Sequence, residues 1–516
     1  MIERLSNYVA GQWQAGTGAG TPLVDPVLGN ELVRVDATGL DLAAAFAYAR
    51  EQGGKALRAL SYRQRAAILA DVVKVLQANR DAYEEIATAN SGTVKNDSAV
   101  DIDGGVYTLS TYARLGVGLG DRRFLIDGEP ASLGKEALFQ SQHVMVPTRG
   151  LALFINAFNF PSWGLWEKAA PALLSGVPVV IKPATATAWL TQRMVKDVVD
   201  SGLLPPGALS VVCGSSAGLL DALEPFDVLS FTGSAETAQL IRSHAAVAQR
   251  SVRVNIEADS LNSALLLEGA VAGDAAFELL VKEVAREMTQ KSGQKCTAIR
   301  RVFVPEALYG AVAEAISARL GKTSVGNPRN ESVRMGALVN RAQLDAVRAG
   351  LATLLSQAEA LHDGAKHALV DADPAVACCV GPTLLGTRAA DAADRVHDTE
   401  VFGPVATLMP YRDAGHALAL IQRGQGSLAV SIYGSDAAAL GATALELAAG
   451  HGRVHVVSPD VAAMHTGHGN VMPQSLHGGP GRAGGGEELG GARALNFYHR
   501  RAAIQASTSV LSPMVG

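Results

Sequence analysis

Five apolar segments of strand length, separated by helix-length segments, constrain the fold of this chain most strongly. They are residues 151–155, 177–181, 209–213, 228–231 and 252–256. Helices are predicted for the intervening segments 163–174, 189–199, 217–223 and 235–246. Continuous apolar strands that alternate with helices are typical of a parallel sheet buried on both faces. Residues 150–256 are therefore predicted to form a doubly wound nucleotide-binding sheet.

The flanking segments extend this α/β pattern in both directions. Residues 8–39 are rich in Gly, Pro, Val and Thr and are predicted to form short strands and turns, whereas 40–90 has amphipathic helical spacing. A further helix is predicted after Asp274, a plausible N-cap residue, because apolar side chains recur at helical spacing beyond it. Gly293 is expected to terminate this helix, which places Cys296 in the loop that follows.

Charge and cysteine content exclude several classes of protein. Lys and Arg number 44 and Asp and Glu 49, a net charge of −5, which argues against nucleic-acid binding through a basic face. Four cysteines in 516 residues make no disulfide framework and indicate a reducing compartment. The N-terminus lacks a signal-peptide pattern, and the longest apolar stretch is too short for a membrane span. We therefore expect a cytoplasmic protein with no membrane or nucleic-acid partner.

A glycine-rich segment near the C-terminus matches a dinucleotide-binding pattern only in form. Residues 479–484 have the spacing G-x-G-x-x-G. In a dinucleotide-binding unit that spacing follows a strand and opens a helix. Here the preceding residues form no apolar strand, and too little chain follows for another nucleotide-binding domain. The segment is therefore predicted to be a structural glycine loop, within a tail over 465–491 that is predicted to be a loop throughout.

Cys296 is the strongest single candidate for a reactive group. It follows a polar segment and belongs to no hydrophobic period, whereas Cys213 ends an apolar strand. A nucleophilic thiol needs exposure and a means of forming its thiolate, while an apolar position indicates packing. Composition alone does not decide whether Cys296 is a nucleophile or a packing residue.

Five motifs, in the same order and spacing, resemble those of the aldehyde dehydrogenase superfamily over nearly the whole chain. They are Asn156-Ala-Phe-Asn-Phe-Pro161, Val179-Val-Ile-Lys-Pro-Ala184, Phe231-Thr-Gly-Ser234, Gly293-Gln-Lys-Cys296 and Glu400-Val-Phe-Gly-Pro-Val405. The resemblance implies an α/β, aldehyde dehydrogenase-like fold with a Rossmann-like cofactor domain, an α/β catalytic domain and a small bridging element. It also implies the oxidation of an aldehyde to a carboxylate with a nicotinamide cofactor.

The same resemblance implies the catalytic residues. Cys296 matches the family nucleophile, which forms a thiohemiacetal with the aldehyde, and Asn159 matches the side-chain donor to its oxyanion. Glu257 matches the general base, although its flanking residues depart from the family pattern. Glu167 and Lys168 lie on the helix after Asn159. They form either an ordinary charged pair or a pair in which Glu167 assists proton transfer near the thiol.

A cofactor site follows from the resemblance as well. Gly233 and Ser234 lie where a strand leads into a helix, and helix N-termini bind phosphate. Many NAD-using relatives carry a glutamate where this chain has Thr185. A carboxylate there would repel a 2′-phosphate, so NADP is expected to be preferred and NAD less favoured. The predicted cofactor-binding residues are Phe158, Lys182, Ala184, Thr185, Gly233, Ser234, Glu400 and Phe402.

The predicted substrate rests on a narrower similarity. Residues 166–171 and 476–490 are similar to a branch of the family that oxidises CoA-linked semialdehydes from aromatic-acid breakdown. A CoA-linked aldehyde is therefore the expected small-molecule substrate, with its thioester left uncleaved. From residue types alone, the histidines of the 465–491 tail are expected only to shape a loop. With the resemblance, the candidate donors to the CoA phosphates are His465, His468, His477 and Arg482, and no metal site is expected.

Three other functions remain open at this point. They are a general dehydrogenase for free medium-chain aldehydes, a CoA-acylating dehydrogenase and a non-enzymatic binding protein on the same fold. CoA-acylating enzymes tend to lack the general base, so Glu257 argues against that function. An intact set of Cys296, Asn159 and Glu257 argues against a binding protein.

The predicted domain organisation has three parts. Residues 1–124 and 149–260 form a cofactor-binding domain, 261–480 a catalytic thiol domain, and 125–148 with 481–516 a bridging element and C-terminal arm. Exposed strands in the bridging element are expected to pair with a second subunit. A homodimer or a dimer of dimers is therefore expected.

Overall fold

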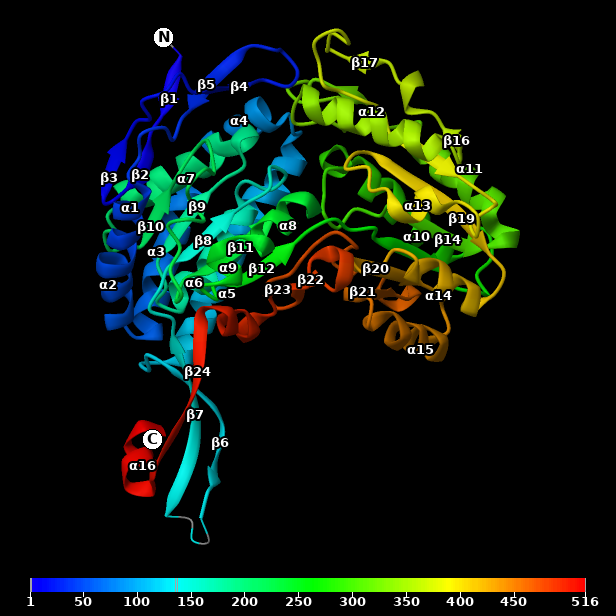
Figure 1. Ribbon diagram of the computed structural model, residues 1–516. Helices are drawn as coiled ribbons and strands as arrows, with labels where there is room; N and C mark the ends of the chain where they lie inside the picture. Colours follow the sequence, from blue (N-terminus) through cyan, green and yellow to red (C-terminus); the bar gives the residue numbers. More distant parts are fainter. Residues whose placement is uncertain (1, 135, 137, 516) are drawn as a thin grey trace.

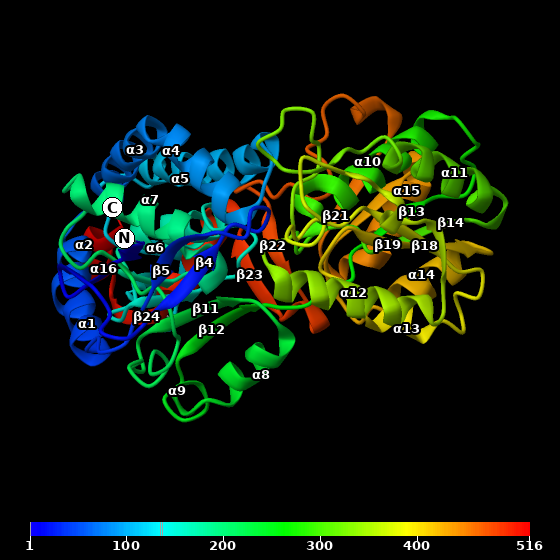
Figure 2. The same cartoon turned by 90° about the horizontal axis from the view of Figure 1, so that it is seen from above.

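Two α/β units lie side by side in the protein, and a narrow arm extends from one of them (Figures 1 and 2). The computed structural model describes residues 2–134, 136 and 138–515. In these residues no helix is both long and apolar enough to cross a membrane. All four cysteines are free.

The first unit is built on a seven-stranded sheet with the order β12-β11-β8-β9-β10-β2-β3. The five strands from β12 to β10 are parallel, as predicted, and β2 and β3 extend the sheet antiparallel beyond β10. One face packs on α3, α5, α6 and α7, and the other on α1, α8 and α9. The strands are β2 (Asn7–Val9), β3 (Gln12–Gln14), β8 (Ala152–Ile155), β9 (Val179–Lys182), β10 (Leu209–Val211), β11 (Val228–Thr232) and β12 (Arg253–Glu257). The helices are α1 (Leu42–Tyr48), α3 (Tyr62–Ala78), α5 (Lys95–Leu119), α6 (Trp163–Leu174), α7 (Ala188–Asp200), α8 (Ala235–Ser243) and α9 (Ala245–Ala248).

Two of the predicted helices in this unit are wrong in detail. Residues 217–223 form turns, because Gly218 adopts a left-handed conformation with φ of 78°. The segment 235–246 is broken at His244, which is extended and accepts a hydrogen bond from the Ala246 N–H. The break therefore coincides with a new N-cap.

The second unit contains another seven-stranded sheet, with the order β16-β18-β19-β14-β13-β20-β21. The predicted helix is α10 (Ala275–Thr289), and Asp274 caps it by accepting from the Phe277 N–H at 2.8 Å. It ends at Thr289, before the predicted terminator Gly293. The strands are β13 (Ser263–Leu266), β14 (Arg301–Pro305), β16 (Glu359–His362), β18 (Thr383–Gly386), β19 (Val405–Tyr411), β20 (Ser427–Tyr433) and β21 (His451–Val457). The other helices are α11 (Tyr309–Leu320), α12 (Arg341–Leu355), α13 (Asp394–Asp398), α14 (Ala414–Gln422) and α15 (Ala437–Ala448).

The arm is a three-stranded antiparallel sheet with the order β24-β7-β6. It joins β6 (Leu125–Ser132) and β7 (Phe139–Pro147) to β24 (His499–Ser507), which is followed by α16 (Thr508–Val515). Smaller elements complete the fold: β1 (Glu3–Leu5), β4 (Thr21–Val24), β5 (Glu31–Val35), α2 (Lys55–Ala59), α4 (Arg80–Ile86), β15 (Val325–Gly326) and β17 (Leu369–Val370).

The glycine-rich tail returns from the second sheet to the first. It was predicted to be a loop throughout, but β22 (Leu476–Gly479) and β23 (Gly486–Leu489) pair antiparallel. The predicted structural glycine loop, 479–484, connects them. A Cβ on Gly484 would lie 2.3 Å from the Ile256 carbonyl oxygen, so this close approach requires glycine. The hairpin is thereby held against the strand end that carries Glu257.

Candidate active site

Cys296 lies where two cavities meet. The larger, of about 630 Å³, is lined by Cys296, Glu257 and Asn159 together with all eight residues predicted to bind the cofactor. The smaller, of about 390 Å³, is lined by Cys296 with residues of α5 and with Phe160 and Trp163. The structure therefore brings the predicted catalytic and cofactor residues together around one thiol.

The backbone before Cys296 has an unusual conformation. Lys291, Ser292 and Gly293 are all left-handed, with φ of 52°, 54° and 68°. Such strain costs about 1–3 kcal/mol for each non-glycine residue and needs external support. Asp97 accepts from the Lys291 N–H at 2.9 Å, and the Ser292 hydroxyl donates to the Gly336 carbonyl at 3.0 Å. These contacts hold the loop that presents the thiol.

Two side chains fix the same loop from the other side. The Asn262 amide donates to the Cys296 carbonyl at 2.8 Å and to the Ala298 carbonyl at 3.0 Å. The Arg300 guanidinium donates to the carbonyls of Gly293 and Lys295 at 2.9 and 3.1 Å. The sequence contained no signal for either role, because both act on backbone atoms of residues that the fold brings to them.

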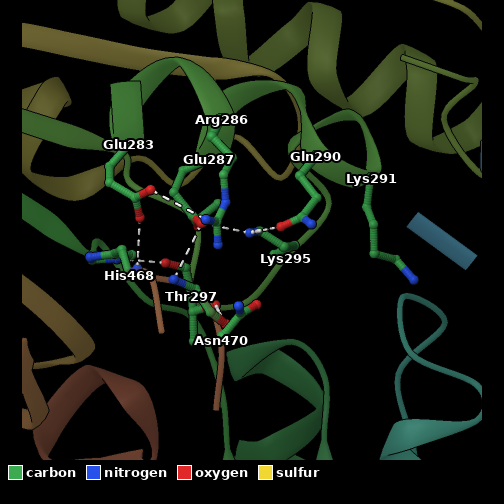
Figure 3. Close-up of polar contacts among 12 residues, drawn as sticks. Glu283, Arg286, Glu287, Gln290, Lys291, Lys295, Thr297, His468 and Asn470 are labelled. Atoms are coloured by element: carbon green, nitrogen blue, oxygen red, sulfur yellow. Dashed lines mark hydrogen bonds and ion pairs between the residues drawn. The ribbon is translucent and has the colours of Figure 1, made fainter. Parts of the chain in front are cut away.

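A buried polar network surrounds Lys295, the residue before Cys296 (Figure 3). Lys295 donates to Glu287 and to Gln290, each at 2.8 Å. The His468 N–H donates to Glu283 at 3.0 Å, and its imidazole lies 2.8 Å from the Thr297 carbonyl. Lys291 points away from this cluster, and its ammonium lies 4.2 Å from the centre of the Phe160 ring. Lys295 is therefore a structural cation rather than a free group in the site.

Glu257, at the end of β12, is buried beside both Cys296 and His477. Its carboxylate lies 3.2 Å from His477 Nε2. Burial on its own raises the pKa of Glu257, but the positive charge of His477 outweighs it and holds that pKa well below its usual range. Burial and then the charge of Glu257 raise the pKa of the Cys296 thiol well above its usual value. The resting pair is thus a carboxylate and a neutral thiol, with Glu257 the adjacent base.

Glu167 and Lys168 are part of a buried charge cluster. The Lys168 ammonium lies 2.6 Å from Glu167 and 3.2 Å from Glu488, and all three side chains are at least nine-tenths buried. Burial raises the pKa of Glu167 to about 8. Glu167 and Lys168 thus form a charged pair, one of the two predicted possibilities, and the pair is buried. A role of Glu167 in proton transfer stays a prediction. Glu167 and Lys168 also line a small space together with Cys296 and Glu257.

The residues of the larger cavity fit a nicotinamide dinucleotide. Lys182 and Thr185 supply donors for phosphate or hydroxyl groups, and the rings of Phe158 and Phe402 lie edge to face with centres 5.7 Å apart. Glu400 accepts from the Ser260 N–H, but its buried Oε1 has no hydrogen-bond partner, as a carboxylate awaiting sugar hydroxyls would have. Burial raises its pKa to about 7.

Gly233 and Ser234 lie at the start of α8, where Ser234 accepts from the Thr237 N–H at 3.3 Å. The Ala235 N–H is already bonded to Asp259 at 3.1 Å, so part of this helix terminus has a carboxylate partner. Sequence reasoning missed Asp259, and it missed Gln343, which donates to the Phe402 carbonyl at 2.7 Å.

The residues predicted to bind CoA phosphates do not form one site. His468 is fully buried between Ser431 and Thr297, and His477 is 3% exposed beside Glu257, so neither can reach an external phosphate. His465 pairs with His455 at 3.3 Å. Arg482 lines the larger cavity beside Asp398. The burial of His468 and His477 corrects the prediction for these two residues.

Comparison with known proteins shows which family this chain is similar to in sequence and in fold. A family model described as "Aldehyde dehydrogenase family" matches residues 13–503. The 3,4-dehydroadipyl-CoA semialdehyde dehydrogenase of Aromatoleum evansii is 54% identical over 478 residues, which cover 92% of this chain and 93% of that protein. The succinate-semialdehyde dehydrogenase of Burkholderia pseudomallei has the same fold, with a TM-score of 0.83, 26% identity and 98% coverage of each chain. An NADP-dependent enzyme of E. coli matches with a TM-score of 0.84 at 22% identity over 98% of each chain.

Proposed function

The chain belongs to the aldehyde dehydrogenase family, and on that premise we propose that it oxidises 3,4-dehydroadipyl-CoA semialdehyde to 3,4-dehydroadipyl-CoA in an NADP-dependent reaction of aromatic-acid breakdown. The observation that carries this proposal is the Cys296 thiol at the junction of a polar and an apolar cavity, beside Glu257. The substrate is supported by the 54% identical relative that bears this name.

In the first half-reaction, the thiol of Cys296 attacks the aldehyde carbon. Glu257 takes the thiol proton, since it is the adjacent carboxylate and is held ionised by His477. Asn159, with the backbone N–H of Cys296, donates to the oxyanion of the thiohemiacetal, and losing one such donor typically costs about 100- to 1,000-fold in rate. A bound nicotinamide dinucleotide supplies the hydride acceptor, held by Lys182, Thr185, Ser234 and Glu400.

In the second half-reaction, Glu257 activates a water molecule that attacks the resulting thioester. The carbon–sulfur bond to Cys296 breaks, the product leaves as a carboxylate, and the thiol is restored. Burial raises the pKa of Glu167 to about 8, so its carboxyl is largely protonated at neutral pH and can donate a proton in this site. The presence of Glu257 favours this hydrolysis over transfer to free CoA.

The CoA thioester is proposed to act as a handle that stays intact. The smaller cavity is lined mainly by apolar side chains, and among its described lining residues the only cation, Lys295, is bound to Glu287. That lining suits the acyl chain but not a nucleotide, so the adenosine part of CoA must lie outside this cavity. Binding energy from such a remote handle can accelerate reaction at the aldehyde carbon.

The proposed substrate is tested by comparing kcat/KM for the CoA-linked semialdehyde with that for free medium-chain aldehydes. The CoA-linked compound is expected to be superior in kcat as well as in KM, since truncation removes binding energy used in the transition state. A parallel assay with added free CoA checks for acyl transfer, which should be absent. Equal or better use of the free aldehydes would leave only a general aldehyde dehydrogenase.

NADP preference is proposed to depend on Thr185. Its hydroxyl donates to the Gly214 carbonyl at 3.3 Å, and its side chain lines the cofactor cavity near Lys182. Thr185→Glu should shift the ratio of kcat/KM values toward NAD by about tenfold or more, because a carboxylate repels a 2′-phosphate. Thr185→Gln, of equal size but neutral, is the matched control and should change the ratio far less. A wild-type preference for NAD would contradict the proposal.

The arm is proposed to pair with a second copy of the chain, giving a homodimer or a dimer of dimers. Its outer strands, β6 and β24, are sheet edges, and its exposed apolar side chains include Leu138, Phe139 and Val510. Exposed strand edges favour pairing with another chain. We also propose the domain boundaries predicted above. A cytoplasmic location is proposed as well, and the four free cysteines fit a reducing compartment.

A further inference from the structure

We propose that Cys296, Glu257 and His477 form a binding site for Zn²⁺, and that the bound ion blocks turnover. One ligand atom from each residue, a sulfur, a carboxylate oxygen and an imidazole nitrogen, lies within 4.8 Å of the other two. Zinc binds sulfur at about 2.3 Å and nitrogen or oxygen at about 2.0–2.2 Å, so tetrahedral ligand atoms lie roughly 3.3–3.7 Å apart. Only a small movement of the side chains is needed to reach that geometry.

One of these ligand groups has an unsatisfied polar atom. Among the buried side-chain atoms that the structure describes, Glu257 Oε1 has no hydrogen-bond partner, whereas His477 Nε2 lies 3.2 Å from the other oxygen of Glu257. Both side chains are only 3% exposed. Buried polar atoms without a partner are uncommon and costly, and a coordinated cation would satisfy Glu257 Oε1. This observation is independent of the distances among the three ligands.

The three ligands are held on separate, fixed elements. Glu257 ends β12, His477 lies on β22, and Cys296 follows the loop fixed by Asn262. The glycine loop holds the β22–β23 hairpin against β12, where the Ala258 N–H donates to the Ala483 carbonyl at 2.9 Å. The site is therefore largely preorganised by packing that does not depend on a metal.

The ligand types select zinc over the common hard cations. A thiolate with an imidazole suits Zn²⁺ or Co²⁺, whereas Mg²⁺ and Ca²⁺ prefer oxygen ligands throughout. Cys296 and Glu257 both line the larger cavity, which gives the ion an access path and leaves its fourth position for water. On binding, the thiol proton passes to solvent and the sulfur forms a bond to the metal. The nucleophile and the base are then both occupied, so turnover stops without any change in oxidation state.

The test uses the full chain without cofactor or substrate, titrated with Co²⁺ as a spectroscopic probe. We expect a thiolate-to-cobalt charge-transfer absorption that saturates at one Co²⁺ per chain and is removed by competing Zn²⁺. Cys296→Ser should abolish the band, and His477→Gln should weaken Co²⁺ binding at least about tenfold. His477→Cys, which retains a ligand, should keep tight binding and strengthen the thiolate band. Cys378→Ser and Cys379→Ser serve as matched thiol controls and should leave the band unchanged.

The outcomes separate clearly. A band that survives in Cys296→Ser, or binding that is equal in wild type, His477→Gln and His477→Cys, would overturn the site. Circular dichroism of each variant confirms that it is folded, and His477→Cys keeps the test decisive if His477→Gln does not fold. Because binding is read without substrate, the result does not depend on which aldehyde the enzyme oxidises.

Discussion

Replacement of Cys296 by alanine is expected to lower kcat by roughly 10⁴-fold or more, since the nucleophile that forms the covalent intermediate is lost. Cofactor binding should be retained, because the other residues of the larger cavity are unchanged and the thiol supplies no fixed charge there. The measurement combines steady-state formation of NADPH with equilibrium binding of NADP to the same protein.

A matched control is available for this change. Cys378 is buried in the core of the second unit, away from both cavities, so Cys378→Ala should retain turnover. Substantial activity in Cys296→Ala would refute the thiol mechanism. Loss of NADP binding in that variant would instead show that Cys296 supports the cofactor cavity.

The substitution Glu257→Gln is expected to slow steady-state turnover by about 10²- to 10⁴-fold, the usual contribution of a general base. Deacylation should suffer most, because water is a weaker nucleophile than a thiol and depends more on the base. Rapid mixing should therefore show a burst of NADPH, of at most one per active site, before a slow steady state. The exposed Glu487 on β23 gives a control, and Glu487→Gln should behave as wild type.

In Glu257→Gln the thiol proton must pass to solvent, so the absence of a burst would show that solvent cannot replace Glu257 as the acceptor of that proton. In that case acylation as well as deacylation would depend strictly on this carboxylate, which lines the same cavity as Cys296. A steady-state rate equal to that of wild type would contradict the proposed role of Glu257 altogether.

The sequence predicts the parts of this protein that depend on local pattern. The parallel sheet followed from five apolar strands, and α10 from its Asp274 cap and apolar periodicity. The gathering of Cys296, Glu257 and Asn159 around one cavity was predicted through motif resemblance, and the structure places them together. Local pattern failed where one glycine changed the backbone, as at Gly218.

Residues that act across the fold could not be predicted in this way. His477 was expected to contact a phosphate, but the β22–β23 hairpin carries it inward to Glu257. Glu488 reaches Lys168 through the same hairpin. Asn262 and Arg300 bind backbone carbonyls, which no side-chain motif reveals. In each case the contact joins segments distant in sequence, and its partner is known only when the tertiary structure is known.

The most direct test of the proposed function is mass spectrometry of Glu257→Gln after mixing with 3,4-dehydroadipyl-CoA semialdehyde and NADP. We predict a single adduct on Cys296 whose mass contains the whole oxidised acyl chain with its CoA thioester intact. The adduct should be absent from the double variant that also carries Cys296→Ala. An adduct that lacks CoA, an adduct on another residue, or no adduct despite a burst of NADPH would contradict the account.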